Sequence, residues 1–250
     1  MATGTLGHPW PSPEGLELAK FLIIRGEIVG KSNVFDLLGP IMVGPSSSHT
    51  AGAVRLGGMA RKILGEEPVE GTIFLHGSFA KTGKGHGTDL ALLAGLLGML
   101  PDDERISDSP KLAKEQGLSV NYENADLGEV HPNTVKFDLV GKSGAHVQVV
   151  GSSIGGGTIV ICEINDFQVE IRGDYPTLVI LHQDLPGLVA QVTLLLATAQ
   201  INIASMRVSR EKRGAQALMV LETDQTIDNA VLDLMRKLPR IEQALAIEPL

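Results

Sequence analysis

Two short segments of the chain combine hydroxyl groups, histidines and cations directly ahead of apolar runs. The residues that could contact a ligand there are Ser46, Ser47, Ser48, His49 and Thr50 in the first segment, and His76, Lys81, Lys84 and His86 in the second. Exposed amides at the start of a helix, with hydroxyls beside them, suit a carboxylate or a phosphate. The pattern therefore predicts an anion site built from two segments that each precede a helix.

Both segments also allow a purely structural interpretation in place of an anion site. Serine and threonine cap helices routinely, and a cap contributes about 1 kcal/mol. The glycine-rich segment Gly77–Gly87 is not a nucleotide-binding P-loop, because five residues rather than four separate Gly77 from Gly83-Lys84, and Gly85 follows. A solvated basic loop is the alternative for this second segment.

The histidines and the single cysteine limit the metal chemistry of the chain. A three-histidine site from His49, His76 and His86 is not favoured, because these residues form no pair spaced i and i+4 on one helix face. Cys162 alone cannot form an internal disulfide or hold zinc or an iron-sulfur cluster. We expect it to be a small buried hydrophobe in a strand, and the compartment to be a reducing cytoplasm.

Composition indicates a packed globular protein and excludes some partners. The 250 residues are 43% hydrophobic and 20% charged, with a net charge of -8. A nucleic-acid binder needs a basic stripe, and a membrane span needs about 20 apolar residues, so neither is expected. Residues 1–32 lack the basic start and cleavage site of a signal peptide and are interpreted as an N-terminal extension. The length favours two domains.

The elements that must position the candidate residues follow from periodicity and turn signals. We expect a helix over Ser48–Leu64, a buried strand over Thr72–His76, a loop over Gly77–Gly87 and a helix over Leu90–Leu100 capped by Thr88 or Asp89. Period-two alternation then predicts strands. These are expected at Val135–Leu139, Ala145–Val150, Thr158–Ile164 and Phe167–Ile171, with a hairpin at Asn165-Asp166 and a tight turn at Gly155–Gly157.

After an interruption at Gly173–Thr177, the pattern changes to a repeated strand and helix order. The expected elements are strand Leu178–His182, helix Leu188–Ala199, strands Ile203–Arg210 and Ala215–Thr223, helix Ile227–Lys237 and strand Ile241–Ile247. This βαββαβ order is typical of a ferredoxin-like fold. The fold class is therefore α/β (α+β), with a mixed domain over 33–173 and a ferredoxin-like domain over 177–250.

Three motifs resemble the beta chain of iron-sulfur-dependent L-serine dehydratase, in that family's order. They are Ser32–Ala53, His76–Asp89 and Gly151–Gly157, and the C-terminal portion resembles an ACT domain through Asp184–Leu188 and Ile201–Ile203. The resemblance implies an allosteric-substrate-binding-like domain followed by an ACT domain. It also implies conversion of L-serine to pyruvate and ammonia with a 4Fe-4S cluster held by a cysteine-rich alpha subunit, and no metal in this chain.

The ACT resemblance implies an amino-acid effector site between paired domains, hence dimerisation, and points to Asp184, Gly187 and Asn202. Asp184 and Asn202 are equally suited to turns. A competing hypothesis is a non-catalytic amino-acid sensor docking on another protein. Phosphoglycerate dehydrogenase shares both accessory domains but requires a dinucleotide fold with Gly-x-Gly-x-x-Gly, which this chain lacks.

Overall fold

The computed structural model describes residues 41–250, apart from the side chain of Lys84. These residues belong to one compact unit, Gly39–Leu250. The expected N-terminal extension, and the part of the first motif before residue 41, lie outside the described residues. Within the described part, no helix is both long and apolar enough to cross a membrane.

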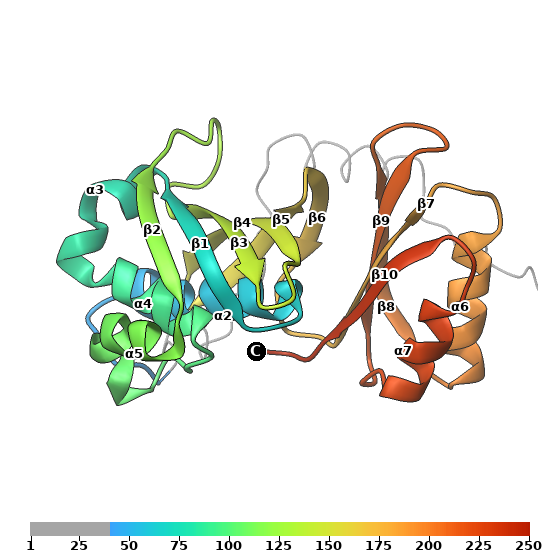
Figure 1. The fold of residues 1–250 in the computed structure, drawn as a ribbon, viewed down its shortest axis with the longest axis horizontal. Helices are drawn as coiled ribbons and strands as arrows, with labels where there is room; N and C mark the ends of the chain where they lie inside the picture. The colour runs from blue at the N-terminus through green and yellow to red at the C-terminus, as the bar shows by residue number, and fades with distance from the viewer. Residues whose placement is uncertain (1–40) are drawn as a thin grey trace, which may run out of the picture. The chain divides into compact units, whose positions relative to one another are not determined.

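The first sheet is mixed and has six strands in the order β2-β1-β3-β4-β5-β6 (Figure 1). The strands are β1 Pro68–Leu75, β2 Ser119–Asn124, β3 Thr134–Gly141, β4 His146–Gly155, β5 Thr158–Ile164 and β6 Phe167–Ile171. Only β1 and β2 run parallel, and β3 to β6 form an antiparallel meander. The meander and both of its expected turns are confirmed, with positive φ at Asn165 and Asp166 and at all three glycines of Gly155–Gly157.

Two helices, α2 (Gly52–Leu64) and α4 (Thr88–Leu96), lie on the first sheet and against each other (Figure 1). A π-helical turn, η2 (Ser47–Ala51), leads into α2, so the expected helix over Ser48–Leu64 is confirmed with a distorted first turn. Its cap is Ser46, whose hydroxyl accepts the His49 amide. The apolar residues of α2 and α4 are buried almost completely, which explains why the apolar positions of the second helix covered most of its circumference.

The expected loop over Gly77–Gly87 is wrong, because residues Gly77–His86 form a helix, α3. Its glycines disfavour helix locally by about 1 kcal/mol each. Tertiary packing outweighs this preference, since Phe79 is fully buried in the core and Gly83 packs against Thr88. The expected cap of the next helix is wrong too: Gly87, in the left-handed conformation, separates α3 from α4, and neither Thr88 nor Asp89 caps it.

One helix and one strand were not expected at all. Helix α5 (Ser109–Gln116) follows a 3-10 turn, η3 (Glu104–Asp108), and leads into β2 at the edge of the sheet. β2 is largely exposed, with little apolar alternation along it. It pairs with β1 through its backbone, in register from Glu70 with Ser119, and this pairing leaves little trace in side-chain types.

The second sheet is antiparallel, in the order β10-β7-β9-β8, with α6 and α7 on one face (Figure 1). Its elements are β7 Thr177–Gln183, α6 Leu188–Thr198, β8 Ile203–Arg210, β9 Gln216–Thr223, α7 Asn229–Arg236 and β10 Ile241–Ile247. Every expected element is present, with ends that differ by at most two residues. Leu178, Ile180, Val192 and Leu196 are among the residues that form its core. The ferredoxin-like prediction is confirmed.

Candidate anion-binding site

His49 lies at the centre of a cluster of polar side chains drawn from η2 and α3. Its ring is half-buried and meets the edge of Phe79 in a T-shaped contact, with ring centroids 5.2 Å apart. Its Nδ1 lies 3.4 Å from the hydroxyl of Ser46, the residue that caps the turn. The cap and the buried aromatic ring together fix the orientation of this imidazole.

One face of α3 presents Ser78, Thr82 and His86 to His49. The three residues are spaced four apart, so they follow one another along one side of the helix. His49 Nε2 lies 3.2 Å from Ser78 Oγ and 3.3 Å from Thr82 Oγ1, and those two hydroxyls are 3.2 Å apart. The rings of His49 and His86 lie 4.9 Å apart. We call these four residues the histidine-hydroxyl cluster.

The electrostatics of the cluster favour a neutral His49. Burial lowers the pKa of His49, and repulsion by His86 lowers it further. A neutral imidazole surrounded by hydroxyls can donate or accept hydrogen bonds at little cost. The cluster can therefore hold a polar group of a ligand without first breaking an ion pair.

Three buried hydroxyls near this region have no hydrogen-bond partner among the described residues: Thr50, Thr88 and Ser153. The Ser153 hydroxyl lies against the backbone of Gly52, where a Cβ would stand 2.0 Å from it. Thr50 and Ser153 thus flank the start of α2. Buried hydroxyls without partners are costly, and two of these three, Thr50 and Ser153, lie at the start of α2.

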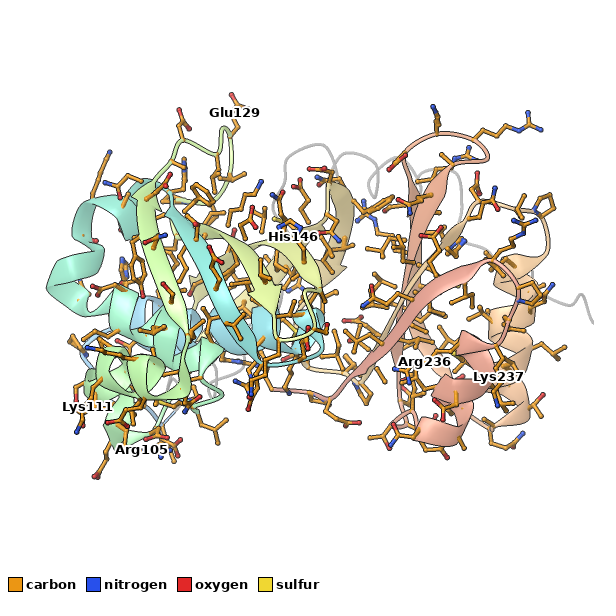
Figure 2. All side chains as sticks on the ribbon, in the orientation of Figure 1. Arg105, Lys111, Glu129, His146, Arg236 and Lys237 are labelled. Carbon is orange, nitrogen blue, oxygen red and sulfur yellow. The ribbon has the colours of Figure 1, made fainter. Side chains whose placement is uncertain are left out.

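His76 does not join the cluster but anchors the loop between β2 and β3. Its Nδ1 accepts the Leu127 amide at 3.1 Å and lies 3.8 Å from the Asp126 carboxylate. The same loop covers the start of α3, where the Ser78 amide donates to the Pro132 carbonyl at 2.7 Å. That amide is therefore satisfied within the chain. Glu129 lies on the exposed outer part of this loop (Figure 2).

Ser47, Ser48 and Lys81 make no side-chain hydrogen bond with the described residues. Ser47 and Ser48 are half-buried in η2, and Lys81 is exposed on α3. Lys84 belongs to α3, but its side chain lies outside the described residues. Ser78 and Thr82 were not among the residues predicted for this site. Their spacing with His86 is a helical signal, hidden because the segment was interpreted as a loop.

The part of the chain that the structure describes does not fit an iron-sulfur cluster. Cys162 is half-buried in β5, its thiol lies 3.4 Å from the Val150 carbonyl, and burial raises its pKa. A thiol held protonated by burial is a poor metal ligand. Residues 41–250 also contain no group of three or more histidine, cysteine or acidic residues placed to hold a metal ion.

The three ACT candidates lie at two ends of the second sheet. Asp184 accepts the Gly214 amide at 3.2 Å and Arg210 at 3.0 Å, and these hydrogen bonds lower its pKa. Gly187 is close by, at the start of α6. Asn202 instead donates to Asp224 at 2.7 Å.

The distance between these two ends follows from the pairing of the strands. β7 and β8 both run antiparallel to β9, so the end of β7 and the start of β8 are separated by the length of β9. Eight residues of strand span roughly 25 Å. Within one chain, Asp184 and Asn202 therefore cannot contact one small ligand.

Comparisons with known proteins agree on both parts of the chain. Residues 33–163 match the family model of the serine dehydratase beta chain, and residues 177–240 match that of the ACT domain. A probable L-serine dehydratase beta chain of Bacillus subtilis is 44% identical, over 86% of this chain and 97% of the relative. An L-serine dehydratase beta chain of Peptoniphilus asaccharolyticus is 39% identical, over 86% and 98%. A D-3-phosphoglycerate dehydrogenase of Methanocaldococcus jannaschii is 26% identical, over 90% of this chain but 42% of the relative.

Proposed function

Because this chain belongs to the serine dehydratase beta chain family and carries an ACT domain, we propose that it is the beta subunit of an L-serine dehydratase. In this role it deaminates L-serine to pyruvate and ammonia together with an alpha subunit that bears a 4Fe-4S cluster. The observation that carries the proposal is the match along nearly the whole length of two serine dehydratase beta chains. The histidine-hydroxyl cluster gives it a chemical site.

The contribution of this chain, in the proposal, is to bind and orient the substrate. L-Serine has a carboxylate, an ammonium group and a hydroxyl. The Ser78 hydroxyl and the His49 imidazole offer hydrogen-bond donors to the carboxylate, whereas the Thr82 hydroxyl and His86 Nδ1 already donate to the Ser78 and Thr82 carbonyls. A carboxylate held at a fixed position limits the orientations of the rest of the molecule, which raises the rate of any reaction at its other end.

In this proposal the 4Fe-4S cluster and its chemistry belong to the alpha subunit, since the described residues of this chain offer no set of thiolates to hold it. The test is anaerobic co-expression with a candidate cysteine-rich alpha chain, co-purification, and a pyruvate assay with L-serine. The isolated chain is expected to be colourless and inactive, whereas the complex is expected to be brown and active. A brown, active isolated chain would contradict the division of labour.

The ACT domain supports a second, regulatory part of the proposal: it binds an amino-acid effector between two copies of the chain. Asp184 and Asn202 lie at opposite ends of one sheet, so a two-fold pairing of sheets would place Asp184 of one copy near Asn202 of the other. Analytical ultracentrifugation with and without L-serine tests this pairing. If the chain binds an amino acid and assembles, but forms no complex with an alpha chain, it is a sensor instead.

A further inference from the structure

A cleft lies between α4, α5 and β2, outside both the histidine-hydroxyl cluster and the ACT domain (Figure 1). Its lining is mostly apolar, with three buried side chains and two half-buried ones: Leu93, Ala113 and Leu118, and Leu90 and Val120. Sites for small molecules are usually clefts of this kind, in which an apolar lining is combined with a few polar groups that orient the ligand. The cleft is therefore a candidate site for a small ligand with an apolar part.

Two hydrogen bonds fasten the walls of the cleft to one another. The Tyr122 hydroxyl, on β2, donates to the Asp89 carbonyl at 2.9 Å. The Ser109 hydroxyl, at the start of α5, donates to the Leu90 carbonyl at 2.9 Å. Asp89 and Leu90 are neighbours in the first turn of α4, so β2 and α5 are both attached to the same turn. The cleft is thus formed before a ligand arrives, and binding needs little rearrangement of the chain.

Two residues of opposite charge line the cleft, and they come from different walls. Lys114 belongs to the last turn of α5 and carries an ammonium group, whereas Asp89 belongs to the first turn of α4 and carries a carboxylate. β2 is the edge strand of the first sheet, so its outer backbone groups have no strand partner among the described residues. These groups together suit a small ligand that carries both charges beside an apolar side chain.

From this arrangement we infer that the cleft binds a free α-amino acid with an apolar side chain, of about the size of leucine. The carboxylate of the ligand meets Lys114, its ammonium group meets Asp89, and its side chain packs on Leu93 and Leu118. L-Serine is a poor ligand for this cleft, because its hydroxyl would lie against carbon atoms without a hydrogen-bond partner. The inference therefore goes beyond the proposed function, since it concerns a different site and a different class of ligand.

The first test locates the ligand by NMR on the full chain without any partner subunit, with L-leucine as the probe. Saturable shifts are expected for amides of α5 and β2. L-Serine is expected to bind there at least tenfold more weakly, which corresponds to about 1.4 kcal/mol. The absence of saturable shifts with L-leucine at about 10 mM, a concentration that detects millimolar affinity, would overturn the site. Shifts confined to the ACT domain would also overturn it and would support the effector site there.

The second test compares two lysines of α5 by calorimetry with L-leucine. Lys114→Gln removes the cation that lines the cleft and is expected to weaken binding by up to about fivefold, the effect of a charge pair open to water. Lys111→Gln is the matched control, because Lys111 is an exposed cation on the same helix that does not line the cleft (Figure 2). This variant is expected to bind as wild type. Equal affinities of the two variants for L-leucine would overturn the carboxylate contact.

The third test asks whether the ligand must be an amino acid. Isocaproate is leucine without its amino group, so it keeps the carboxylate and the side chain but has no ammonium group for Asp89. The wild-type chain is expected to bind it several-fold more weakly than L-leucine, whereas Asp89→Asn should bind the two probes equally. Equal binding of both probes by the wild-type chain would overturn the assignment of an amino acid. All three tests use the isolated chain, so their outcome does not depend on whether an alpha subunit restores a pyruvate-forming enzyme.

Discussion

The crossing of α2 and α4 and the neighbouring helix α3 are both rich in glycine, yet the glycines have opposite consequences. At the crossing, a Cβ on Gly57 would lie 2.2 Å from the Leu92 carbonyl, and one on Gly95 would lie 2.1 Å from the Val54 carbonyl. In α3, a Cβ on Gly85 would meet nothing within 4 Å. The crossing therefore has no room for a side chain at Gly57 or Gly95, whereas α3 has room for one at Gly85.

The difference separates a tightly packed pair of helices from a helix with a weaker local preference for helical structure. Backbones in direct contact leave α2 and α4 little freedom, and η2, which carries His49, is continuous with α2. α3 gains less from its own backbone, because glycine raises the conformational entropy of the unfolded chain. The histidine-hydroxyl cluster thus joins one rigidly held residue to three residues of a weaker helix.

The largest effect is expected for Gly57→Ala at the crossing. The added methyl group overlaps the Leu92 carbonyl and forces the helices apart, so the free energy of unfolding should fall by about 1–3 kcal/mol or more. Urea denaturation measures the change. Gly58→Ala is the matched control, because its Cβ would make only ordinary contacts, 3.7 Å or more away. Equal destabilisation by both changes would remove the distinction between the two regions.

His49→Ala tests whether the rigid side of the cluster contributes to binding. With its alpha partner, the variant is expected to lose about tenfold in kcat/KM for L-serine, equivalent to about 1.4 kcal/mol. Iron content and subunit association should be unchanged. His131→Ala, in the β2–β3 loop, provides a histidine outside the cluster for comparison. Full activity in His49→Ala would show that η2 serves only to cap the helix.

Asn202→Ala examines the ACT domain, far along the chain from the cluster. The side-chain amide of Asn202 donates to Asp224 beside the start of β8. Loss of this amide should change amino-acid-dependent activation or dimerisation by several-fold, which corresponds to about 1 kcal/mol of coupling free energy. Activity at saturating L-serine and sedimentation with and without L-serine measure the two effects. Unchanged serine dependence would identify Asn202 as a turn residue.

The smallest effect is expected for Gly85→Ala in α3, and it has the opposite sign to that of Gly57→Ala. The position is open and helical, so alanine should stabilise the chain by about 0.5–1 kcal/mol through the unfolded state. The midpoint of urea unfolding detects it. A loss of stability would show that α3 packs more tightly than its open surroundings indicate.

The comparison also explains what could be predicted from the sequence. The ferredoxin-like domain follows from strong alternation and clear turns, and its elements were predicted almost residue for residue. Helix α3 could not be predicted in this way, because its glycines disfavour helix locally. The packing of the buried Phe79 offsets that preference, and this packing exists only in the folded chain. β2 is held by backbone pairing with β1, which is invisible in side-chain types.

The candidate site was predicted in part for a related reason. His49 and His86 stood out as residue types, and both belong to the cluster. Ser78 and Thr82 are ordinary hydroxyl residues, and their contacts with His49 join residues about thirty positions apart in the sequence. Reading the segment as a helix would have placed Ser78, Thr82 and His86 on one face, but only the fold brings that face to η2.

The position of β1 in the first sheet bears on the order in which the chain folds. β3 to β6 form a meander through short turns, whereas β1 joins it through long-range pairs such as Leu75 with Val135. Closing a long connection costs more entropy than closing a hairpin, so the meander can form first and β1 can dock later. α3 follows β1 directly, and therefore the two histidines meet only after that docking. We expect pulse-labelled hydrogen exchange to protect the meander amides before those of β1, so that a ligand of the cluster binds only chains in which this last step is complete.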